Sequence, residues 1–145
     1  MAQANAYMTT FRGLFSSALH WEDLTRLWQT LQDQADDGWY VYAVGETPPT
    51  APLTAEQFKN FLTEIDILLR REHDEDYCGI VYANDMSQPG MVKIYDPNNL
   101  GSSCGSSGNT PPPLPGWIIS RLAPPGLEAL QPVASRRRWW QRLFD

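Results

Sequence analysis

The sequence predicts an α+β fold, a two-layer sandwich with two or three helices on one face of a small, mostly antiparallel four-stranded sheet. Three observations predict it. Residues 20–35 and 54–71 repeat apolar side chains at helical spacing. Four short stretches rich in aromatic and β-branched residues lie between turn sequences. A chain of 145 residues, 42% of them apolar, is long enough to bury one core.

The first part of the chain is expected to be helical. Spaced apolar residues between positions 7 and 19 favour a short first helix. A stronger pattern covers residues 20–35, where acidic residues in the first turn suit the helix dipole and Gly38 is placed to end the helix. The apolar face of this helix holds Leu24, Leu27, Trp28, Leu31 and Ala35.

A strand and a second long helix are expected next. Residues 39–44 are aromatic and β-branched, which favours a strand, and residues 45–52 contain three prolines and are predicted to be a loop. Thr54 and Gln57 have the spacing of a capping box, so a helix is expected to begin there. Its apolar stripe consists of Phe58, Phe61, Leu62, Ile65, Leu68 and Leu69.

Three further strands complete the predicted sheet. Residues 77–83 and 91–95 flank a turn sequence and are expected to form an antiparallel hairpin with a long loop. Residues 117–122 are expected to form the last strand, because prolines bound their apolar run. Residues 100–116, which are rich in glycine, serine and proline, are predicted to be irregular.

Composition divides the chain into three parts. Residues 1–122 are expected to form a single acidic α+β domain, residues 123–135 a proline-rich tether, and residues 136–145 a basic aromatic C-terminal tail. Residues 1–135 contain 7 basic and 16 acidic side chains, a net charge of −9. The tail contains 4 arginines and 1 aspartate, a net charge of +3. This asymmetry favours a tail that contacts an acidic surface.

Composition also argues against several classes of protein. The acidic domain is expected to repel nucleic acid, because such binding depends on neutralising phosphates. No apolar run approaches the ~20 residues that cross a bilayer, and residues 1–15 lack the features of a secretory signal. Two cysteines are too few for a disulfide framework, so a cytoplasmic location is expected. No Walker, GxGxxG or HExxH motif occurs, and neither a cofactor nor a metal is expected.

The segment from Gly101 to Gly108 holds the one weak candidate for a catalytic residue, Cys104. Its first five residues match the nucleophile-elbow pattern, but prolines follow where that motif needs a helix. Cys104 in a phosphate-cradling loop and a backbone nest for an anion are further interpretations. The first lacks a nearby cation, since residues 105–116 contain no Lys or Arg. A flexible surface loop is favoured over all three.

Thiol and metal chemistry have weaker support. Cys104 would need His20 or His73 as a base, and no pattern pairs them. Cys78 lies in an apolar stretch and is expected to be a buried, unreactive thiol. The acidic residues 72–76, with Asp85 and Asp96 at other loop ends, match no calcium loop and are expected to be solvated.

The tail carries the most specific pattern. Built as a helix from Ser135, it places its apolar residues on one side and arginines largely on the other. Such a helix suits an apolar groove on a partner, an anionic membrane surface, or a return onto its own acidic domain. Docking on a partner is favoured, because Trp and Arg are enriched in binding hot spots. The predicted partner-binding residues are Arg137, Arg138, Trp139, Trp140, Arg142, Leu143 and Phe144.

These patterns favour a non-enzymatic cytoplasmic adaptor or assembly factor that docks a partner protein through its tethered tail. The expected partner is acidic or has an apolar groove. One alternative is a small cysteine-dependent enzyme or thiol switch that uses the loop around Cys104. The other is a peripheral membrane protein anchored by the tail on an anionic surface.

Overall fold

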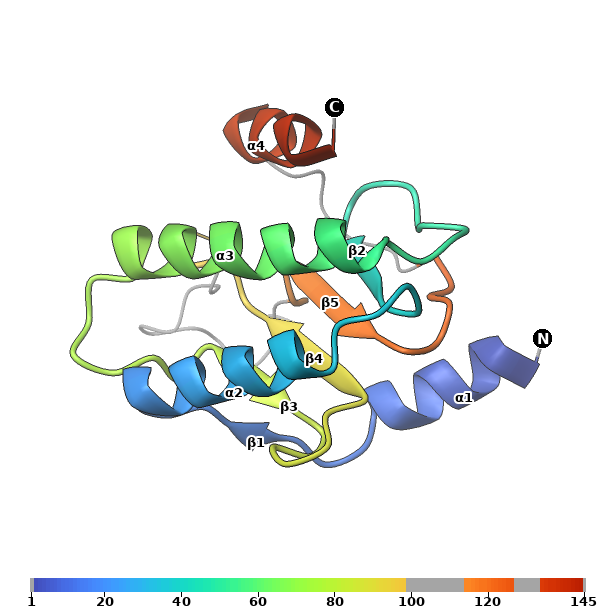
Figure 1. Cartoon of the computed structure of the whole chain (residues 1–145), viewed down its shortest axis with the longest axis horizontal. Coiled ribbons are helices and arrows are strands. Elements are labelled where there is room, and N and C mark those ends of the chain that lie inside the picture. Colours follow the sequence, from blue (N-terminus) through green and yellow to red (C-terminus); the bar gives the residue numbers. More distant parts are fainter. Residues whose placement is uncertain (1, 99–113, 127–133, 145) are drawn as a thin grey trace, which may run out of the picture.

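The computed structural model describes residues 2–98, 114–126 and 134–144. The segment around Cys104 and most of the predicted tether lie outside these ranges. Figure 1 shows α2 and α3 side by side over the sheet, with α4 beyond α3. The described elements are α1 (Ala2–Phe11), β1 (Ser16–Ser17), α2 (Trp21–Asp33), β2 (Tyr40–Ala43), α3 (Ala55–Glu72), β3 (Val81–Ala83), β4 (Met91–Ile94), β5 (Trp117–Ser120) and α4 (Ala134–Phe144).

The five strands of the described residues form one antiparallel sheet in the order β1-β3-β4-β5-β2. The predicted α+β sandwich and the β3–β4 hairpin are confirmed. The predicted count of four strands misses β1, in which Ser16 and Ser17 pair with β3. Two serines carry no apolar alternation, so only the pairing itself defines this strand.

The main core lies between the sheet and the pair α2 and α3. Successive strand residues point to opposite faces, and Val41, Val92 and Ile119 are among those that face the two helices. The apolar faces predicted for both helices are buried, apart from the terminal Ala35, which is half-buried. The buried helix residues are Leu24, Leu27, Trp28, Leu31, Phe58, Phe61, Leu62, Ile65, Leu68 and Leu69.

A smaller core lies on the opposite face of the sheet, where α1 packs. Tyr7 of α1 belongs to a buried cluster with Tyr42, Met91 and Ile118. The predicted pair of helices on one face is thus confirmed by α2 and α3, whereas α1 covers the other face, because an apolar stripe does not specify which face of a sheet it covers. The first helix also spans Ala2–Phe11 instead of residues 7–19, since the chain turns beyond Phe11 and enters β1.

The strand β3 is shorter than the predicted residues 77–83. Gly79 has a φ of +68°, a conformation that residues with a side chain rarely adopt. The amides of Cys78 and Gly79 donate to the carbonyl oxygens of Leu19 and Ala18, at 2.7 and 3.0 Å. The chain before β3 therefore bonds to the segment that precedes α2.

The helix α3 begins at its predicted cap. The Thr54 hydroxyl accepts a hydrogen bond from the Gln57 amide at 3.1 Å, and the Gln57 side chain accepts one from the Thr54 amide at 3.0 Å. The Asp37 carboxylate accepts a further bond from the Ala55 amide at 2.8 Å. These bonds satisfy amides that a helix start leaves unpaired, so α3 is a well-fixed support for the elements around it.

Candidate functional site

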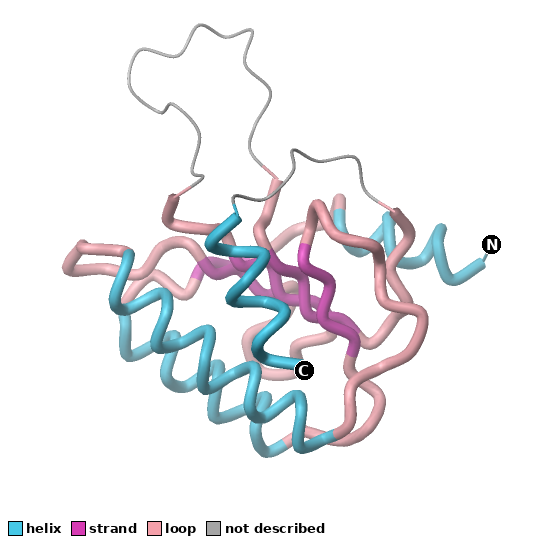
Figure 2. The backbone as a smooth tube through the Cα atoms, turned by 90° about the horizontal axis from the view of Figure 1, so that it is seen from above, coloured by secondary structure: helices cyan, strands magenta, loops and turns pink. Residues whose placement is uncertain are grey.

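The tail residues form the helix α4, and its apolar side lies against the rest of the chain. Figure 2 shows α4 in front of α3 when the molecule is seen from above, and both views place it on the side of α3 away from α2. Trp139, Trp140 and Leu143 pack against the main core. Of the arrangements open to the tail, the structure shows its apolar residues resting on the body, by which we mean the described residues 2–126.

Aromatic edges make the contact between α4 and the body. The Trp139 ring lies 5.6 Å from the Trp117 ring, with 67° between the two planes. The Trp140 ring lies 6.2 Å from the Phe61 ring, at 80°. Both pairs have the edge-to-face geometry and spacing that aromatic quadrupoles favour. Within α4, the centres of the Trp140 and Phe144 rings are 4.7 Å apart, so the two rings also contact each other.

The body contributes two residues from different elements, Phe61 and Trp117, which we call the acceptor strip. Phe61 belongs to the apolar stripe of α3, and Trp117 begins the strand β5, opposite Ala43 and Ile94. With α4 in place, Phe61 is 0% exposed and Trp117 is 3% exposed. The sequence showed both residues as apolar, but only the tertiary fold places them at one surface.

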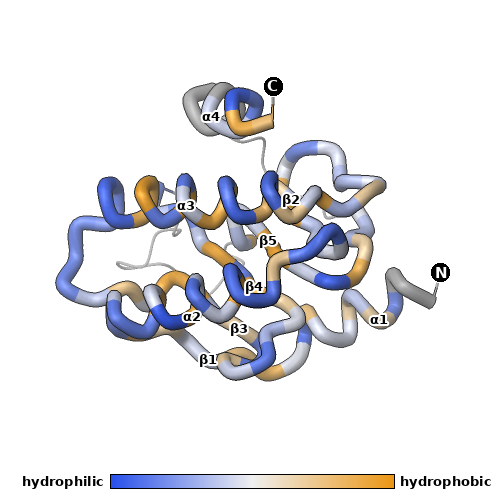
Figure 3. Tube along the Cα trace, in the orientation of Figure 1, coloured by the Kyte–Doolittle hydropathy of each residue, from blue (hydrophilic) through white to orange (hydrophobic). Residues whose placement is uncertain are grey.

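The predicted partner-binding residues divide into two groups in the structure. Trp139, Trp140, Leu143 and Phe144 are half-buried, whereas Arg142 is exposed. Arg142 forms no ion pair with any residue in the described parts of the chain. The side chains of Arg137 and Arg138 lie outside the described residues, although their backbone belongs to α4. Figure 3 shows hydrophilic and hydrophobic residues alternating along α3 and the described end of α4, as in helices with one apolar side.

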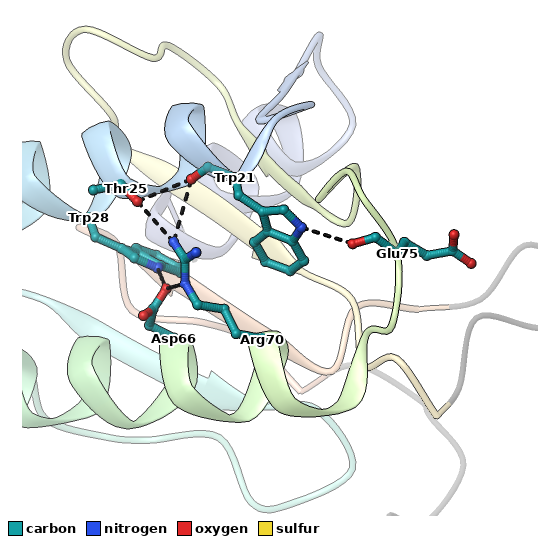
Figure 4. Close-up of polar contacts among 6 residues, drawn as sticks. All are labelled: Trp21, Thr25, Trp28, Asp66, Arg70 and Glu75. Carbon is teal, nitrogen blue, oxygen red and sulfur yellow. Dashed lines mark hydrogen bonds and ion pairs between the residues drawn. The ribbon is translucent and has the colours of Figure 1, made fainter.

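A polar network joins α2 to α3, and each of its side chains has a hydrogen-bond partner within it. Figure 4 shows the Asp66 carboxylate between two donors, the indole of Trp28 at 3.0 Å and the guanidinium of Arg70 at 2.8 Å. Arg70 also donates to the Thr25 hydroxyl at 2.9 Å. Trp28 is almost fully buried, so its indole N–H requires this acceptor. We interpret the network as the bond between two core helices, not as a reactive site.

The loop after α3 is tied down around a buried histidine. The Nε2 atom of His73 lies 2.9 Å from the carbonyl oxygen of Cys78, and the indole of Trp21 donates to the carbonyl of Glu75 at 3.0 Å. The His73 ring also contacts the rings of Trp21 and Tyr77 edge to face. With Nε2 hydrogen-bonded to a backbone carbonyl, His73 has a packing role in this loop.

The structure describes Cys78 but not Cys104. Cys78 is buried, as predicted, and burial raises the pKa of its thiol. A thiol that is hidden and protonated reacts slowly. Cys104, the candidate nucleophile, lies outside the described residues. The thiol-based alternative therefore stays a prediction.

Two of the acidic residues considered as a metal site, Asp85 and Glu72, accept hydrogen bonds from other side chains or amides. The Asp85 carboxylate accepts bonds from Ser87 and Gln88, which lower its pKa, and Glu72 accepts a bond from Asn98 at 2.8 Å. Across residues 2–98, 114–126 and 134–144, no three side chains of the types that ligate metals converge. In the same part of the chain, no helix combines the length and apolar character needed to span a membrane.

Lys93 is a feature that sequence reasoning missed. Its ammonium lies on the α1 side of the sheet, donates to the carbonyl oxygen of Phe11 at 2.6 Å and lies about 4 Å from the ring centres of Phe11 and Phe15. Burial lowers the pKa of this amine. A lysine inside an apolar strand was the available signal. Its contacts hold the end of α1 on the sheet, which is a structural role.

Comparisons with known protein families, with curated proteins and with solved structures found no match. The function is therefore inferred from this chain's own residues. Among the described features, the contact between α4 and the acceptor strip combines an apolar face with opposite net charges. This contact is the candidate functional site.

Proposed function

We propose that this protein is a non-enzymatic cytoplasmic adaptor or assembly factor that docks a partner protein through α4. The observation that carries the proposal is the incomplete burial of the apolar residues of α4. Trp139, Trp140, Leu143 and Phe144 each touch the body or one another, yet all keep part of their surface in water. Indole surface that stays partly exposed is well suited to a second contact.

The length of α4 supports a conditional role for this helix. It has 11 residues, which is below the length at which an isolated helix is stable in water. Its helical form thus depends on a surface that covers its apolar side. The acceptor strip supplies such a surface in the free chain, and a groove on a partner would supply it in the complex.

The chemistry of α4 defines the partner. Two neighbouring indoles require an apolar groove, and the four arginines of the tail favour an acidic rim around it. Arg142 is exposed and forms no ion pair within the described residues, so its charge is available to such a rim. The expected partner is a protein with an apolar groove bordered by carboxylates.

An affinity capture from cell extract tests this proposal. The bait is the full chain, compared with the full chain carrying Trp139→Ala and Trp140→Ala. The matched control carries Leu14→Ala and Ile67→Ala, two apolar residues that are 95% and 49% exposed elsewhere on the body. The proposal predicts that the tail variant loses a specific partner which the control retains. Equal recovery by all three baits would contradict it.

Membrane docking is the second candidate, because α4 is an amphipathic helix with half-buried indoles and an exposed arginine. The test is flotation of the full chain with vesicles of anionic lipid, at low and high salt. Membrane docking predicts salt-sensitive binding that Trp139→Ala with Trp140→Ala abolishes. Absence of binding to these vesicles would remove this candidate and leave the protein partner.

A further inference from the structure

We infer that the acceptor strip is itself a binding surface for a helix of another protein, one with the chemistry of α4. That helix carries two neighbouring aromatic residues on one side and basic residues on the other. The inference rests on the proposed function in one respect, because it takes α4 to leave the strip when a partner binds. It adds a second recognition surface, located on the body.

The first argument is that a helix of this kind already occupies the strip. The Trp139 ring meets Trp117 and the Trp140 ring meets Phe61, both edge to face. With α4 in place, Phe61 and Trp117 are 0% and 3% exposed, and the indoles of α4 pack against the core cluster to which both belong. We expect the departure of α4 to uncover the parts of both rings that Trp139 and Trp140 contact. Apolar surface uncovered in this way favours an interaction site.

The second argument is the rigidity of the strip. Phe61 lies inside an 18-residue helix whose start is fixed by a capping box. Trp117 lies on β5, which pairs with β4 on one side and with β2 on the other. Binding surfaces on paired strands and packed helices keep their shape when a ligand leaves. The strip is therefore expected to persist, ready for another helix, after α4 has moved away.

The third argument is charge. Residues 1–135, which include the body, carry a net charge of −9, so this part of the chain attracts a basic helix and repels an acidic one. The native occupant fits this field, because the tail carries a net charge of +3. A partner helix of the same sign would be guided to the strip by the same attraction.

A helix of another protein competes with α4 for the acceptor strip. A helix tethered to the same chain has an effective concentration in the millimolar range, so it competes strongly with a free helix. The apparent affinity of a partner helix falls by the fraction of molecules in which the strip is vacant. Weakening α4 alone should therefore strengthen the binding of a helix supplied from outside.

The test uses a fluorescein-labelled synthetic peptide with the sequence of residues 134–145, titrated with full-length chains and followed by fluorescence anisotropy. Wild-type chain is expected to bind it weakly, because α4 occupies the strip. The chain with Trp139→Ala and Trp140→Ala is expected to bind at least about tenfold more tightly. A peptide in which both tryptophans are replaced by alanine is the matched control and should not bind.

A third variant tests whether the peptide binds at the acceptor strip. Phe61→Leu keeps an apolar side chain in α3 but removes the ring that Trp140 contacts. Added to the double tail variant, it should reverse most of the gain in peptide affinity while circular dichroism shows an unchanged fold. If the chain with Phe61→Leu does not fold, Trp117→Phe, which retains an aromatic ring, is added to the double tail variant instead and tested for the same loss of peptide affinity.

Two outcomes would overturn the inference. One is equal affinity of the peptide for wild-type chain and for the double tail variant, and the other is absence of binding to both. Either result leaves the proposed function open, because the capture experiment reads the contact of α4 with its own partner. If partner capture does not depend on the tail, but the peptide still binds the double tail variant more tightly, the proposed function is rejected and the acceptor strip is retained.

Discussion

The free energy that holds α4 on the body can be measured by truncating its two indoles. We predict that Trp139→Ala and Trp140→Ala each destabilise the protein by roughly 2 kcal/mol, about half the cost of truncating a fully buried aromatic residue. The reduction follows from the structure, because each indole is half-buried and contacts one ring of the body. Each aromatic pair contributes about 0.5–1.5 kcal/mol of this beyond simple area burial.

The double variant distinguishes a docked helix from two independent contacts. A helix of 11 residues is unstable without its support, so the loss of one indole should release most of α4. Once α4 is released, removing the second indole has little left to break. We therefore expect the double variant to cost roughly 2–3 kcal/mol, clearly less than the sum of the single variants.

Urea unfolding followed by circular dichroism provides the assay, with midpoint and slope fitted for each chain. The control is Leu14→Ala with Ile67→Ala, which changes exposed apolar residues and should stay within about 0.5 kcal/mol of the wild-type stability. Single variants as stable as the wild type would refute the docked arrangement. Strict additivity of the two indoles would refute their coupling through one helix.

Three further predictions concern the body. Asp66→Ala should lower the free energy of unfolding by about 1–3 kcal/mol in urea titrations, because it leaves the buried Trp28 indole N–H without an acceptor; a loss below about 0.5 kcal/mol would contradict this. The hydrogen bond from Arg121 lowers the pKa of Asp36, so the stabilisation from this pair is present above pH 3.8 and is lost as the pH falls below that value. Arg121→Gln should therefore make the thermal stability less sensitive to pH in this acidic range. A pH profile of thermal stability that the substitution leaves unchanged would contradict this. In a variant whose other cysteine is replaced by serine, Cys78 should react with a thiol reagent only as fast as the protein opens. The reason is that Cys78 is 0% exposed and that burial raises the pKa of its thiol. Rapid labelling of the folded protein would count against this.

Elements with strong local signals were predictable from sequence. The start of α3 is encoded by the Thr54 and Gln57 pair, whose reciprocal bonds depend on residues three positions apart. The buried sides of α2 and α3 follow from helical spacing alone. The β3–β4 hairpin was also predictable, because a turn sequence separates two adjacent apolar stretches.

Features that depend on distant pairing were not predictable. The strand β1 exists because Ser16 and Ser17 meet β3, more than sixty positions along the chain. The face chosen by α1 depends on Tyr42, Met91 and Ile118, which come together only in the folded sheet. No local pattern in the first helix contains that information.

The candidate site was predictable on one side only. Sequence identified the apolar residues of α4, because their helical spacing stands out. The acceptor strip was hidden, since Phe61 and Trp117 each resemble ordinary core residues and belong to elements far apart in the sequence. Their shared role arises from the packing of α3 over β5.

The most direct test of the central claim, that α4 is the recognition element, follows its indoles during binding. The chain contains six tryptophans, so 5-fluorotryptophan labelling gives a small set of fluorine NMR signals that Trp139→Phe and Trp140→Phe would assign. On addition of the captured partner, the signals of Trp139 and Trp140 should shift, while those of Trp21 and Trp28 in the α2 and α3 interface should not. A partner that binds while the Trp139 and Trp140 signals stay unchanged would contradict the account.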